Sequence, residues 1–409
     1  MKILFLTIGD NIRDISSRGI YKDLMRKFRD EMHEVFIAAP IERRYNKKTE
    51  LISADSFSIL LIRTPNITQT NLIEKGIATL LIEYLFLKAF KKYFSKVCFD
   101  LILYSTPPIT FAKVIQYVKG KDKSLSYLLL KDIFPQNAVD LGLIKKGSLV
   151  HKYFRKKEKE LYSVSDFIGC MSPANVDYIR NNNPEINQDR LEVNPNCIEP
   201  IESFLSNNKK YSILKKYNIP DNTTVFIYGG SLGKPQGIEF LIEVMKCQLN
   251  EPDKFFIIAG SGTEYGKIKA WYDKTKPKNV LLLSLLPKSE FDLLMQAGDV
   301  GMIFLDSRFT IPNFPSRILS YMEFKLPLIA ATDKTTDLGK VIENNNFGLW
   351  SESGDLSATI LNINKLSKDP VLRKKLGQNG YHFLLDNYTV SNSYETIIKH
   401  CTRNKGTQY

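Results

Sequence analysis

The stretch TVFIYGGSLGKPQGIEFLI, residues 224–242, decides the fold of the second half of the chain. It begins with an apolar run that ends at Tyr228, continues through a glycine pair, and ends in apolar residues at helical spacing. A strand, a glycine turn and a helix in this order hold phosphate groups on backbone N–H groups at the positive end of the helix. The turn offers one cation, Lys234, so a diphosphate bound here needs a second cation from elsewhere in the chain.

The same alternation of strand and helix patterns extends along the whole chain and predicts a parallel α/β architecture. In the first half, the predicted strands are 2–8, 34–40, 57–64, 100–106, 126–132 and 166–172. Helical patterns separate them at 19–29, 76–94, 109–119 and 148–163. In the second half, the predicted strands are 224–230, 254–260, 279–284, 300–306, 327–332 and 347–353.

Two domains are predicted, because 409 residues exceed what one ordinary hydrophobic core holds. The sequence becomes rich in prolines, asparagines and other polar residues at about residues 195–205, and we place the linker there. The predicted domains are residues 1–200 and 201–385, and a C-terminal helix in 386–409 is expected to cross back to the first domain. Two doubly wound domains imply a cleft between them, which is the usual ligand site of this architecture.

The composition narrows the kinds of site that we expect. The five cysteines fall into no CxxC spacing, which argues against a zinc site or a disulfide framework and fits a reducing cytoplasm. The four histidines show no metal spacing and no Asp-x-Asp pair occurs, so neither a metal nor a cofactor is expected. The short run after Met1 does not predict a signal peptide, and no apolar stretch reaches the roughly 18 to 20 residues of a membrane span.

The formal net charge of +13 indicates either an anionic partner or charge that has no specific partner. Solvated, lysine-rich helix faces are one interpretation. An anionic membrane surface is the functional interpretation that we prefer, because apolar and basic residues are interleaved in 77–94 and 145–160. Lys88, Lys91 and Lys92 are the predicted contacts with the inner face of the cytoplasmic membrane. Nucleic acid is not the expected partner, because no recognisable nucleic-acid-binding motif occurs.

Two places in the first half carry candidate site residues. Gly19 begins a helix, where it either lets a phosphate or sugar approach the backbone or merely starts the helix. Lys131 and Asp132 end a strand at the edge that faces the ligand crevice, so Lys131 is assigned to the acceptor side. Asp132 either accepts a hydrogen bond from a substrate hydroxyl or caps the next helix, and the two interpretations weigh equally.

The glycines of FFIIAGSGTEYG, residues 255–266, superficially resemble a dinucleotide fingerprint. Their spacing is GxGxxxG, and the next predicted strand does not end in an acidic residue. A tight turn beside the cleft is therefore the preferred interpretation, ahead of a nicotinamide site.

The stretch 309–333 contains the second cation that the glycine turn needs. Asn313 and Ser316 precede a helix that begins at Arg317, and Ser316 or its neighbour is predicted to cap it. A cation in the first turn of a helix is unfavourable for the helix dipole unless an anion lies at the same place. We therefore predict that Arg317 binds the phosphate at the glycine turn.

Taken together, four stretches resemble the family 4 glycosyltransferases of the GT-B fold, and the resemblance covers nearly the whole chain. They are FIYGGSLGKPQGIEFLI, FFIIAGSGTEYGKIK, LLPKSEFDLLMQAGDVGMIFL and PSRILSYMEFKLPLIA, in the family's order and at its spacing. The first half, with RGIYKDLMRKFRDEMHEVFIAAP and LLLKDIFPQNAVDLG, is similar to a branch of bacterial surface-polysaccharide enzymes that includes proposed N-acetyl-L-fucosamine transferases. The resemblance implies two Rossmann-like domains facing across a cleft. It also implies retaining, metal-independent sugar transfer from a nucleotide-diphosphate donor, with a lean toward UDP, to a lipid-linked saccharide of capsule or O-antigen.

The resemblance also implies where the donor lies. Its diphosphate would bind between the glycine turn and the start of the helix at Arg317, its ribose near Ser320, and its base against 284–290. The predicted donor-binding residues are Gly19, Gly230, Ser231, Lys234, Gln236, Gly262, Pro287, Asn313, Ser316, Arg317 and Ser320. Most relatives place an arginine and a lysine where Ser231 and Gln236 stand, and two glutamates where Pro312 and Ser320 stand. We interpret these differences as a variant site.

Asp132 and Arg317 are the predicted catalytic residues. Arg317 and backbone amides would stabilise the charge that develops on the leaving phosphate. An acceptor hydroxyl oriented by Asp132 would attack on the face that the diphosphate leaves, and a phosphate oxygen would take its proton. Three alternatives stay open: a GT-B nucleotide-sugar epimerase that needs no acceptor, a nucleotide-binding scaffold without catalysis, and a basic nucleic-acid binder.

Overall fold

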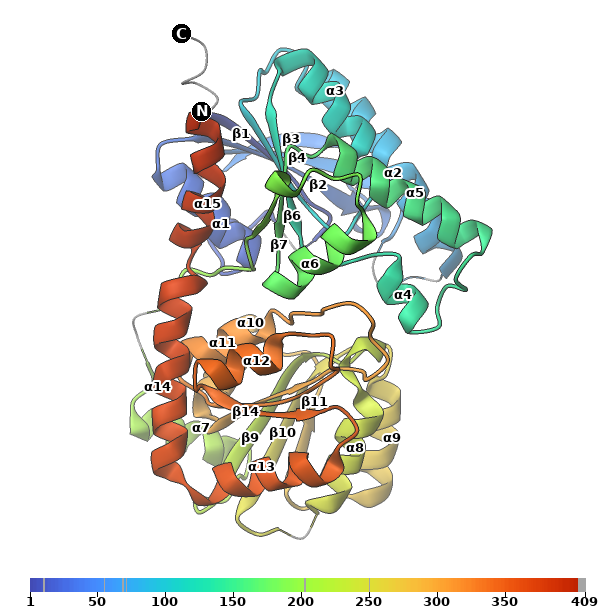
Figure 1. Ribbon diagram of the computed structural model, residues 1–409. Helices are drawn as coiled ribbons and strands as arrows, with labels where there is room; N and C mark the ends of the chain where they lie inside the picture. Colours follow the sequence, from blue (N-terminus) through green and yellow to red (C-terminus); the bar gives the residue numbers. More distant parts are fainter. Residues whose placement is uncertain are drawn as a thin grey trace. The chain divides into compact units, whose positions relative to one another are not determined.

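The computed structural model describes residues 1–9, 12–54, 56–67, 70, 72–201, 204–249 and 251–403. The chain divides into two compact units (Figure 1). Unit 1 comprises residues 1–199 and the last helix, α15 (Val390–Arg403), and unit 2 comprises residues 200–389. Each unit is built on a largely parallel sheet with helices on its faces, so the fold class predicted from the alternating pattern is confirmed.

Unit 1 contains an eight-stranded sheet in the order β3-β4-β2-β1-β5-β6-β7-β8. The strands are β1 (Lys2–Leu6), β2 (Glu34–Glu42), β3 (Glu50–Ala54), β4 (Phe57–Thr64), β5 (Leu101–Ser105), β6 (Leu125–Leu130), β7 (Phe167–Cys170) and β8 (Leu191–Val193). Neighbouring strands are parallel except for β3, which pairs antiparallel with β4 at the edge of the sheet.

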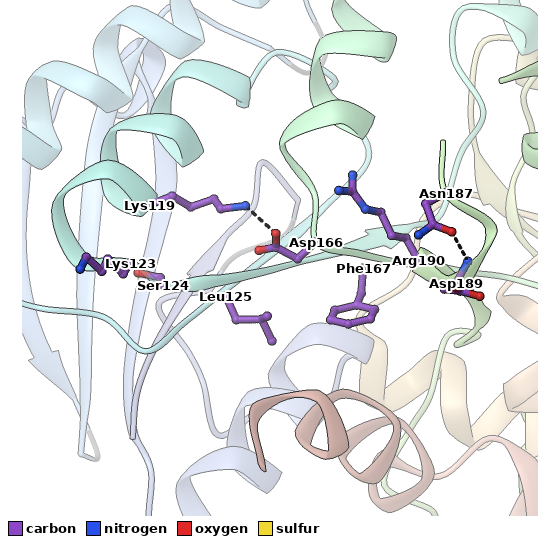
Figure 2. Close-up of a pocket in the computed structure, with 9 residues that line it drawn as sticks. All are labelled: Lys119, Lys123, Ser124, Leu125, Asp166, Phe167, Asn187, Asp189 and Arg190. Carbon is purple, nitrogen blue, oxygen red and sulfur yellow. Dashed lines mark hydrogen bonds and ion pairs between the residues drawn. The ribbon is translucent and has the colours of Figure 1, made fainter. Parts of the chain in front are cut away.

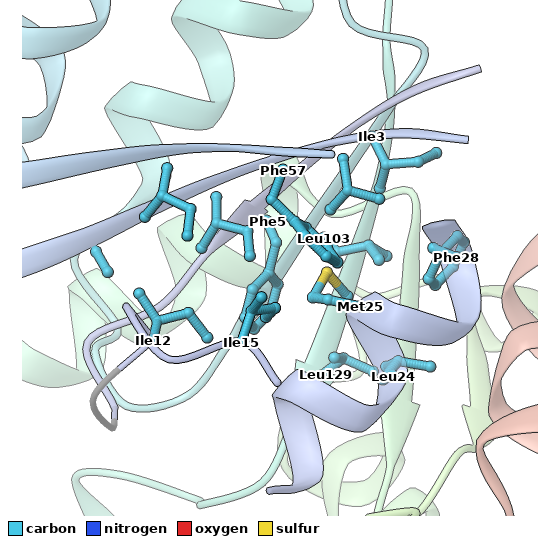
Figure 3. Close-up of a cluster of buried hydrophobic side chains, with 14 of the residues drawn as sticks. Ile3, Phe5, Ile12, Ile15, Leu24, Met25, Phe28, Phe57, Leu103 and Leu129 are labelled. Carbon is cyan, nitrogen blue, oxygen red and sulfur yellow. The ribbon is translucent and has the colours of Figure 1, made fainter. Parts of the chain in front are cut away.

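The helices of unit 1 follow the strands in a doubly wound pattern. They are α1 (Ile20–Asp30), α2 (Leu72–Tyr93), α3 (Ala112–Asp122), α4 (Gln136–Asp140), α5 (Leu149–Val164) and α6 (Pro173–Asn182), with short 3₁₀ turns η1 (Arg43–Tyr45) and η2 (Gln188–Arg190). Figure 3 shows Met25 and Phe28 of α1 packed with Ile3 and Phe5 of β1 in one buried cluster. Helix α15 joins this cluster, because the ring of Tyr394 lies edge-on 5.0 Å from that of Phe28.

Unit 2 contains a six-stranded parallel sheet in the order β11-β10-β9-β12-β13-β14. The strands are β9 (Thr224–Ser231), β10 (Lys254–Ser261), β11 (Val280–Leu283), β12 (Val300–Phe304), β13 (Leu328–Thr332) and β14 (Gly348–Glu352). The central strands are buried along nearly their whole length, because helices cover both faces of a parallel sheet. This explains why the sequence shows continuous apolar runs at these strands.

The helices of unit 2 complete the second doubly wound unit. They are α7 (Asn207–Lys216), α8 (Ile238–Cys247), α9 (Tyr265–Thr275), α10 (Lys288–Ala297), α11 (Arg317–Glu323), α12 (Leu338–Asn344), α13 (Leu356–Lys368) and α14 (Pro370–Asn387), with a 3₁₀ turn η3 (Lys234–Gln236). None of the helices in the described part of the chain is long and apolar enough to cross a membrane.

The structure differs from the sequence prediction at the two edges of the unit 1 sheet. Strands β3 and β8 were not predicted, because both are short and lie at the two edges of the sheet, where burial imposes little pattern. The C-terminal helix predicted in 386–409 corresponds to α15, which belongs to unit 1 and is separated from α14 by a break between Asn387 and Val390. The backbone N–H of Val390 donates to the carbonyl of Ile198, so the chain re-enters unit 1 at this break.

Candidate functional site

The chain order of the unit 2 sheet reverses at β9, which lies between β10 and β12. In doubly wound sheets, ligands bind outside the carboxyl ends of the strands at such a reversal. β9 and β12 pair at Phe226 with Val300 and at Ile227 with Gly301, and the two strands separate beyond these positions. The separation leaves the carboxyl end of β9, with its glycine turn, open to α11.

Tyr321 of α11 fills the gap between the separating strands. Its buried hydroxyl accepts a hydrogen bond from the Gly229 N–H at 3.1 Å. The same hydroxyl lies 3.2 and 3.0 Å from the carbonyl oxygens of Ile227 and Met302 and shares its proton between them. Gly301 leaves room for the ring, since a Cβ there would lie 2.5 Å from it. Tyr321 therefore fixes α11 against the carboxyl ends of β9 and β12.

Arg317 lies one helical turn before Tyr321 and reaches the glycine turn. Its Cζ atom lies 4.5 Å from the centre of the Tyr228 ring, and its Nη2 donates to the carbonyl oxygen of Ser231 at 3.3 Å. Its Nη1 is buried without a hydrogen-bond partner. Among the residues that the structure describes, no carboxylate pairs with Arg317. A partly buried guanidinium with an unused donor favours an anion at this position.

The turn that faces Arg317 has a backbone that requires glycine. Gly230 has φ +114°, and a Cβ there would lie 3.9 Å from the guanidinium. Gln236 closes the turn, because its Oε1 accepts from the Gly233 N–H at 3.1 Å and lies 3.4 Å from the Ser231 Oγ. Lys234 is exposed in η3. The structure thus brings together Arg317 with the glycine turn, as the sequence predicted, and shows Gln236 shaping the turn.

The glycines of the GxGxxxG stretch pack against the same turn. A Cβ on Gly260 would lie 1.8 Å from the carbonyl oxygen of Gly230, and one on Gly262 would lie 2.4 Å from the carbonyl oxygen of Leu232. Gly266 has no neighbour within 4 Å of such a Cβ. The interpretation as a tight turn is confirmed. The geometry gives Gly262 a packing role, and its contact with a donor stays a prediction.

The segment before α11 differs from the prediction in two respects. Ser316 has φ −64° and ψ −17° and its side chain caps no N–H, so Ser316 is not the predicted side-chain cap. The backbone N–H of Asn313 donates to Thr336 Oγ1 at 3.0 Å and is not free for a sugar. The carboxylate of Asp333 holds Thr336 in place, since it accepts from both the N–H and the hydroxyl of Thr336. Pro312 is buried in this segment.

The residues predicted to contact the nucleoside lie on the surface of unit 2. Ser320 is partly buried on α11, three positions after Arg317. Pro287 is exposed immediately before α10 and follows the exposed Leu285 at the end of β11. β11 is the edge strand of the sheet and is separated by β10 from β9, the strand that leads into the glycine turn. Leu285 lies within the stretch 284–290 that was predicted to contact the base, and its exposed side chain offers an apolar surface there.

The helix start at Gly19 of unit 1 is already occupied. The Gly19 N–H donates to the buried carboxylate of Asp23 at 2.9 Å. Gly19 has an extended φ of 167°, and a Cβ there would lie 3.5 Å from the side chain of Lys22. Because a carboxylate fills the place that a phosphate would take, the geometry does not support the predicted phosphate contact at Gly19.

Asp132 follows β6 and is held by a side chain that the sequence analysis missed. Both of its carboxylate oxygens accept from Asn137 Nδ2, at 2.7 and 2.8 Å. Burial raises the pKa of Asp132 to about 6, against the opposing hydrogen bonds from Asn137 and the Ile133 N–H. Asp132 does not cap α4, whose first turn is preceded by Pro135 without a side-chain cap. A spacing of five residues between Asp132 and Asn137 is too unspecific a signal to find this pair.

The predicted acceptor and membrane lysines fall into two groups. Lys88, Lys91 and Lys92 are exposed on α2. Lys131 instead donates from Nζ to the carbonyl oxygen of Asn194 at 3.0 Å, and burial lowers its pKa to about 8. Lys131 is therefore engaged within unit 1, and its contact with an acceptor stays a prediction.

Unit 1 also has a pocket of about 520 Å³ that involves none of the predicted site residues (Figure 2). It lies at the amino ends of β6 and β7, where Lys119 pairs with Asp166 at 2.8 Å. It is lined by Lys119, Lys123, Ser124, Leu125, Asp166, Phe167, Asn187, Asp189 and Arg190. Ligands of doubly wound sheets bind at the opposite, carboxyl edge, so we place the candidate site at Arg317 and the glycine turn of unit 2.

Comparison with known proteins finds a family model that matches most of unit 2. Residues 209–383 match the family described as "Glycosyl transferases group 1". The chain is 22% identical over 258 residues to the "Probable glycosyltransferase WbjE" of Pseudomonas aeruginosa, covering 62% of each chain. It is 21% identical over 132 residues to the "Putative colanic acid biosynthesis glycosyl transferase WcaI" of Escherichia coli (strain K12), covering 32% of each. The chain thus spans less than two thirds of the length of both relatives, and neither name specifies N-acetyl-L-fucosamine.

Solved structures with the same fold cover the whole chain. The sucrose-phosphate synthase (tll1590) from Thermosynechococcus elongatus matches with a TM-score of 0.77 at 15% identity, covering 100% of both chains. Anabaena Alr3699/HepE, in complex with UDP and glucose, matches with a TM-score of 0.71 at 14% identity, covering 98% of this chain and 100% of that one. These likenesses show that the two Rossmann-like units have the GT-B fold, as predicted.

Proposed function

We propose that the chain is a retaining, metal-independent glycosyltransferase that uses a UDP-linked sugar as donor. The transferred group is a hexosyl or N-acetylhexosaminyl group, with N-acetyl-L-fucosamine and related amino sugars as the first candidates. The acceptor is a lipid-linked saccharide of capsule or O-antigen biosynthesis. The family match over residues 209–383 and a relative named for colanic acid biosynthesis support the reaction class and the polysaccharide context. A structural neighbour crystallised with UDP and glucose supports the donor class.

One observation carries this proposal: Arg317 faces the glycine turn with a buried Nη1 that has no partner. Its Nη2 contacts Ser231 at the end of β9, so the guanidinium is held at the reversal point of the sheet. A diphosphate at this position receives the second cation that Lys234 alone does not provide. In this proposal, Arg317 takes the place of the arginine and lysine that most relatives carry in the glycine turn.

The chemistry follows from where negative charge develops. Transfer breaks the bond between the anomeric carbon and the diphosphate oxygen, and the electron pair leaves with the phosphate. Arg317 and the amides of the glycine turn stabilise that charge, and each such donor contributes roughly 3 to 4 kcal/mol to a rate. The acceptor oxygen bonds to the anomeric carbon on the same face, and a phosphate oxygen takes the hydroxyl proton. This route needs no nucleophile from the protein, in contrast to double displacement by two carboxylates.

Unit 1 supplies the acceptor side in this proposal. Asp132 orients the acceptor hydroxyl, because its carboxylate lies at the carboxyl end of β6 and its pKa of about 6 leaves it ionised at neutral pH. Asn137 positions Asp132 through the two hydrogen bonds to its carboxylate. The exposed lysines of α2 bring the protein to the inner face of the cytoplasmic membrane, where a lipid-linked acceptor is located.

A transfer assay tests this function directly. The purified protein is incubated with a panel of UDP-sugars and a bacterial lipid extract, with and without EDTA, and the product is isolated. We expect a glycosylated lipid with retained anomeric configuration by NMR, formed equally in EDTA. Conversion of the donor sugar without a lipid acceptor would instead identify an epimerase. Binding of UDP without turnover of any donor would identify a scaffold.

A further inference from the structure

Helix α2 exposes apolar side chains over its first half. Ile77, Leu80, Leu81 and Tyr84 are 49, 55, 40 and 61% exposed. Their spacing of three and four residues places them on one stripe of the helix. A monomeric protein rarely leaves such a row of large apolar side chains in water.

The opposite side of α2 is buried, so the helix is apolar on two sides. Ile82, Phe86 and Phe90 are buried in unit 1, where α2 packs against β4 and α3. The buried side is what holds α2 against the rest of unit 1. The exposed stripe has no such structural role. Lys88, Lys91 and Lys92 continue the exposed stripe at the same helical spacing. Apolar residues followed by lysines on one helix face are typical of helices that lie at a membrane surface.

Helix α5 and the loop before it extend this surface. Leu149, Val150 and Tyr153 are 84, 52 and 40% exposed at the start of α5, and Leu143 is 59% exposed in the preceding loop. Lys157 of α5 pairs with Glu83 of α2 at 3.5 Å, so the two helices lie side by side in unit 1. We name this surface, made by Leu143, the exposed stripe of α2 and the start of α5, the α2–α5 face.

The acidic groups of these two helices do not offset the lysines. Glu83 is buried and accepts from the Lys113 N–H as well as pairing with Lys157. Glu160 also pairs with Lys157, at 2.9 Å. Glu158 is buried against Arg155. The exposed lysines of the α2–α5 face, with Lys145, Lys146 and Lys152 beside its apolar residues, therefore give it a net positive charge.

We infer that the α2–α5 face inserts its apolar side chains into a bilayer that carries anionic headgroups. This inference rests on the proposed function for the identity of the acceptor, and it adds that binding is hydrophobic as well as electrostatic. Charge complementarity decides the occupant, because a second copy of the chain would bring the same lysines against this face. Burying leucine and tyrosine side chains at the acyl boundary is favourable, and so is placing lysines beside the phosphate groups.

Vesicle sedimentation with the full chain tests both contributions. Vesicles of phosphatidylcholine, with and without phosphatidylglycerol, are mixed with the wild type and with two test variants. The first combines Leu80→Ser and Leu149→Ser, and its control combines Leu361→Ser and Val371→Ser, at 68 and 77% exposed positions of unit 2. The second replaces Lys88, Lys91 and Lys92 by glutamine, and its control replaces the exposed Lys274, Lys276 and Lys278 of unit 2 by glutamine.

We expect each test variant to bind anionic vesicles at least about tenfold more weakly than the wild type, while both controls bind as the wild type does. In high salt, the loss caused by the lysine changes should disappear and the loss caused by the serine changes should persist. Equal losses in test and control variants, or wild-type binding by the serine variant, would overturn the inference. So would a dimer, seen by light scattering, that the serine changes dissociate in the absence of vesicles.

Stabilisation of each variant by UDP, measured as a thermal shift, separates this inference from the proposed function. A test variant that keeps the UDP shift and loses vesicle binding supports the α2–α5 face. A wild type that binds vesicles and gives no UDP shift leaves the face standing and contradicts the proposed function.

Discussion

The first helix after the first strand of each sheet begins in a different electrostatic setting. In unit 1, the Asp23 carboxylate accepts from the Gly19 N–H at the start of α1 and also bonds Arg26 and the Glu199 N–H. In unit 2, the turn after β9 faces Arg317, whose Nη1 is unpartnered. Unit 1 therefore supplies its own anion at this position, and unit 2 supplies a cation. A strand followed by a glycine turn and a helix marks an anion site only where the protein has not already filled it.

Replacing Gly260 by alanine should have the largest effect on stability, because its Cβ would lie 1.8 Å from the Gly230 carbonyl oxygen. The two turns would have to move apart, which we expect to lower the free energy of unfolding by about 3 kcal/mol or to prevent folding. Gly266→Ala is the control in the same stretch, since nothing lies within 4 Å of its Cβ. Gly19→Ala in unit 1 should change stability by less than about 0.5 kcal/mol. Urea unfolding of the three variants makes the comparison, and equal effects at 260 and 266 would contradict it.

Asp132→Asn should separate the acceptor chemistry of unit 1 from donor binding in unit 2. Transfer to the lipid should fall about a hundredfold, while the affinity for UDP stays unchanged. In the wild type, kcat/KM should fall as the pH drops through about 6, the pKa to which burial raises Asp132. The variant should lack this acid limb. An unchanged pH profile in Asp132→Asn would remove Asp132 from the reaction.

The same substitution predicts a pH dependence of stability. The pKa of Asp132 is higher in the folded chain than its ordinary value of 3.8, so the folded state holds this proton more tightly. The ionised carboxylate therefore lowers the free energy of unfolding as the pH rises from about 4 to above 6. Asp132→Asn should be more stable than the wild type at pH 7, by about 3 kcal/mol, and equal to it below pH 4. Asp177→Asn, on the exposed surface of α6, is the control.

Gln236 tests the turn itself, with the smallest expected effect. Gln236→Ala removes the Oε1 that accepts from the Gly233 N–H and should lower the free energy of unfolding by about 1 kcal/mol. Gln236→Glu keeps an acceptor at this place and should keep the stability, but its charge should weaken UDP binding. UDP titration and urea unfolding of both variants check this. Tighter UDP binding by the glutamate variant would place the phosphate elsewhere.

The sequence predicted the two sheets and the pairing of Arg317 with the glycine turn, because buried parallel strands and glycine turns leave strong local patterns. The edge strands β3 and β8 were missed, since they pair along one side and their burial imposes little pattern. The role of Tyr321 was also missed. It depends on a gap between β9 and β12 that exists only once the sheet has formed.

The residues assigned from single positions fared less well than those assigned from patterns. Gly19 was predicted as a backbone contact, but its N–H donates to Asp23. Asn313 was predicted to bind the donor, and its N–H donates to Thr336, so this N–H is not free for that role. Lys131 was assigned to the acceptor side, which stays a prediction, and its Nζ donates to the carbonyl oxygen of Asn194. Asn194 and Thr336 lie 63 and 23 residues from their partners Lys131 and Asn313, so these contacts leave no local signal in the sequence.

The central claim is that Arg317 binds the phosphate of a nucleotide at the glycine turn of unit 2. Isothermal titration of UDP into the wild type and Arg317→Ala, in buffer with EDTA, tests it most directly. Arg180→Ala, at an arginine of α6 that pairs with Asp177, serves as the control. The account predicts that UDP binds the wild type in EDTA, binds the control equally, and binds Arg317→Ala roughly 10 to 100 times more weakly. Equal UDP affinity in the wild type and a folded Arg317→Ala would contradict it.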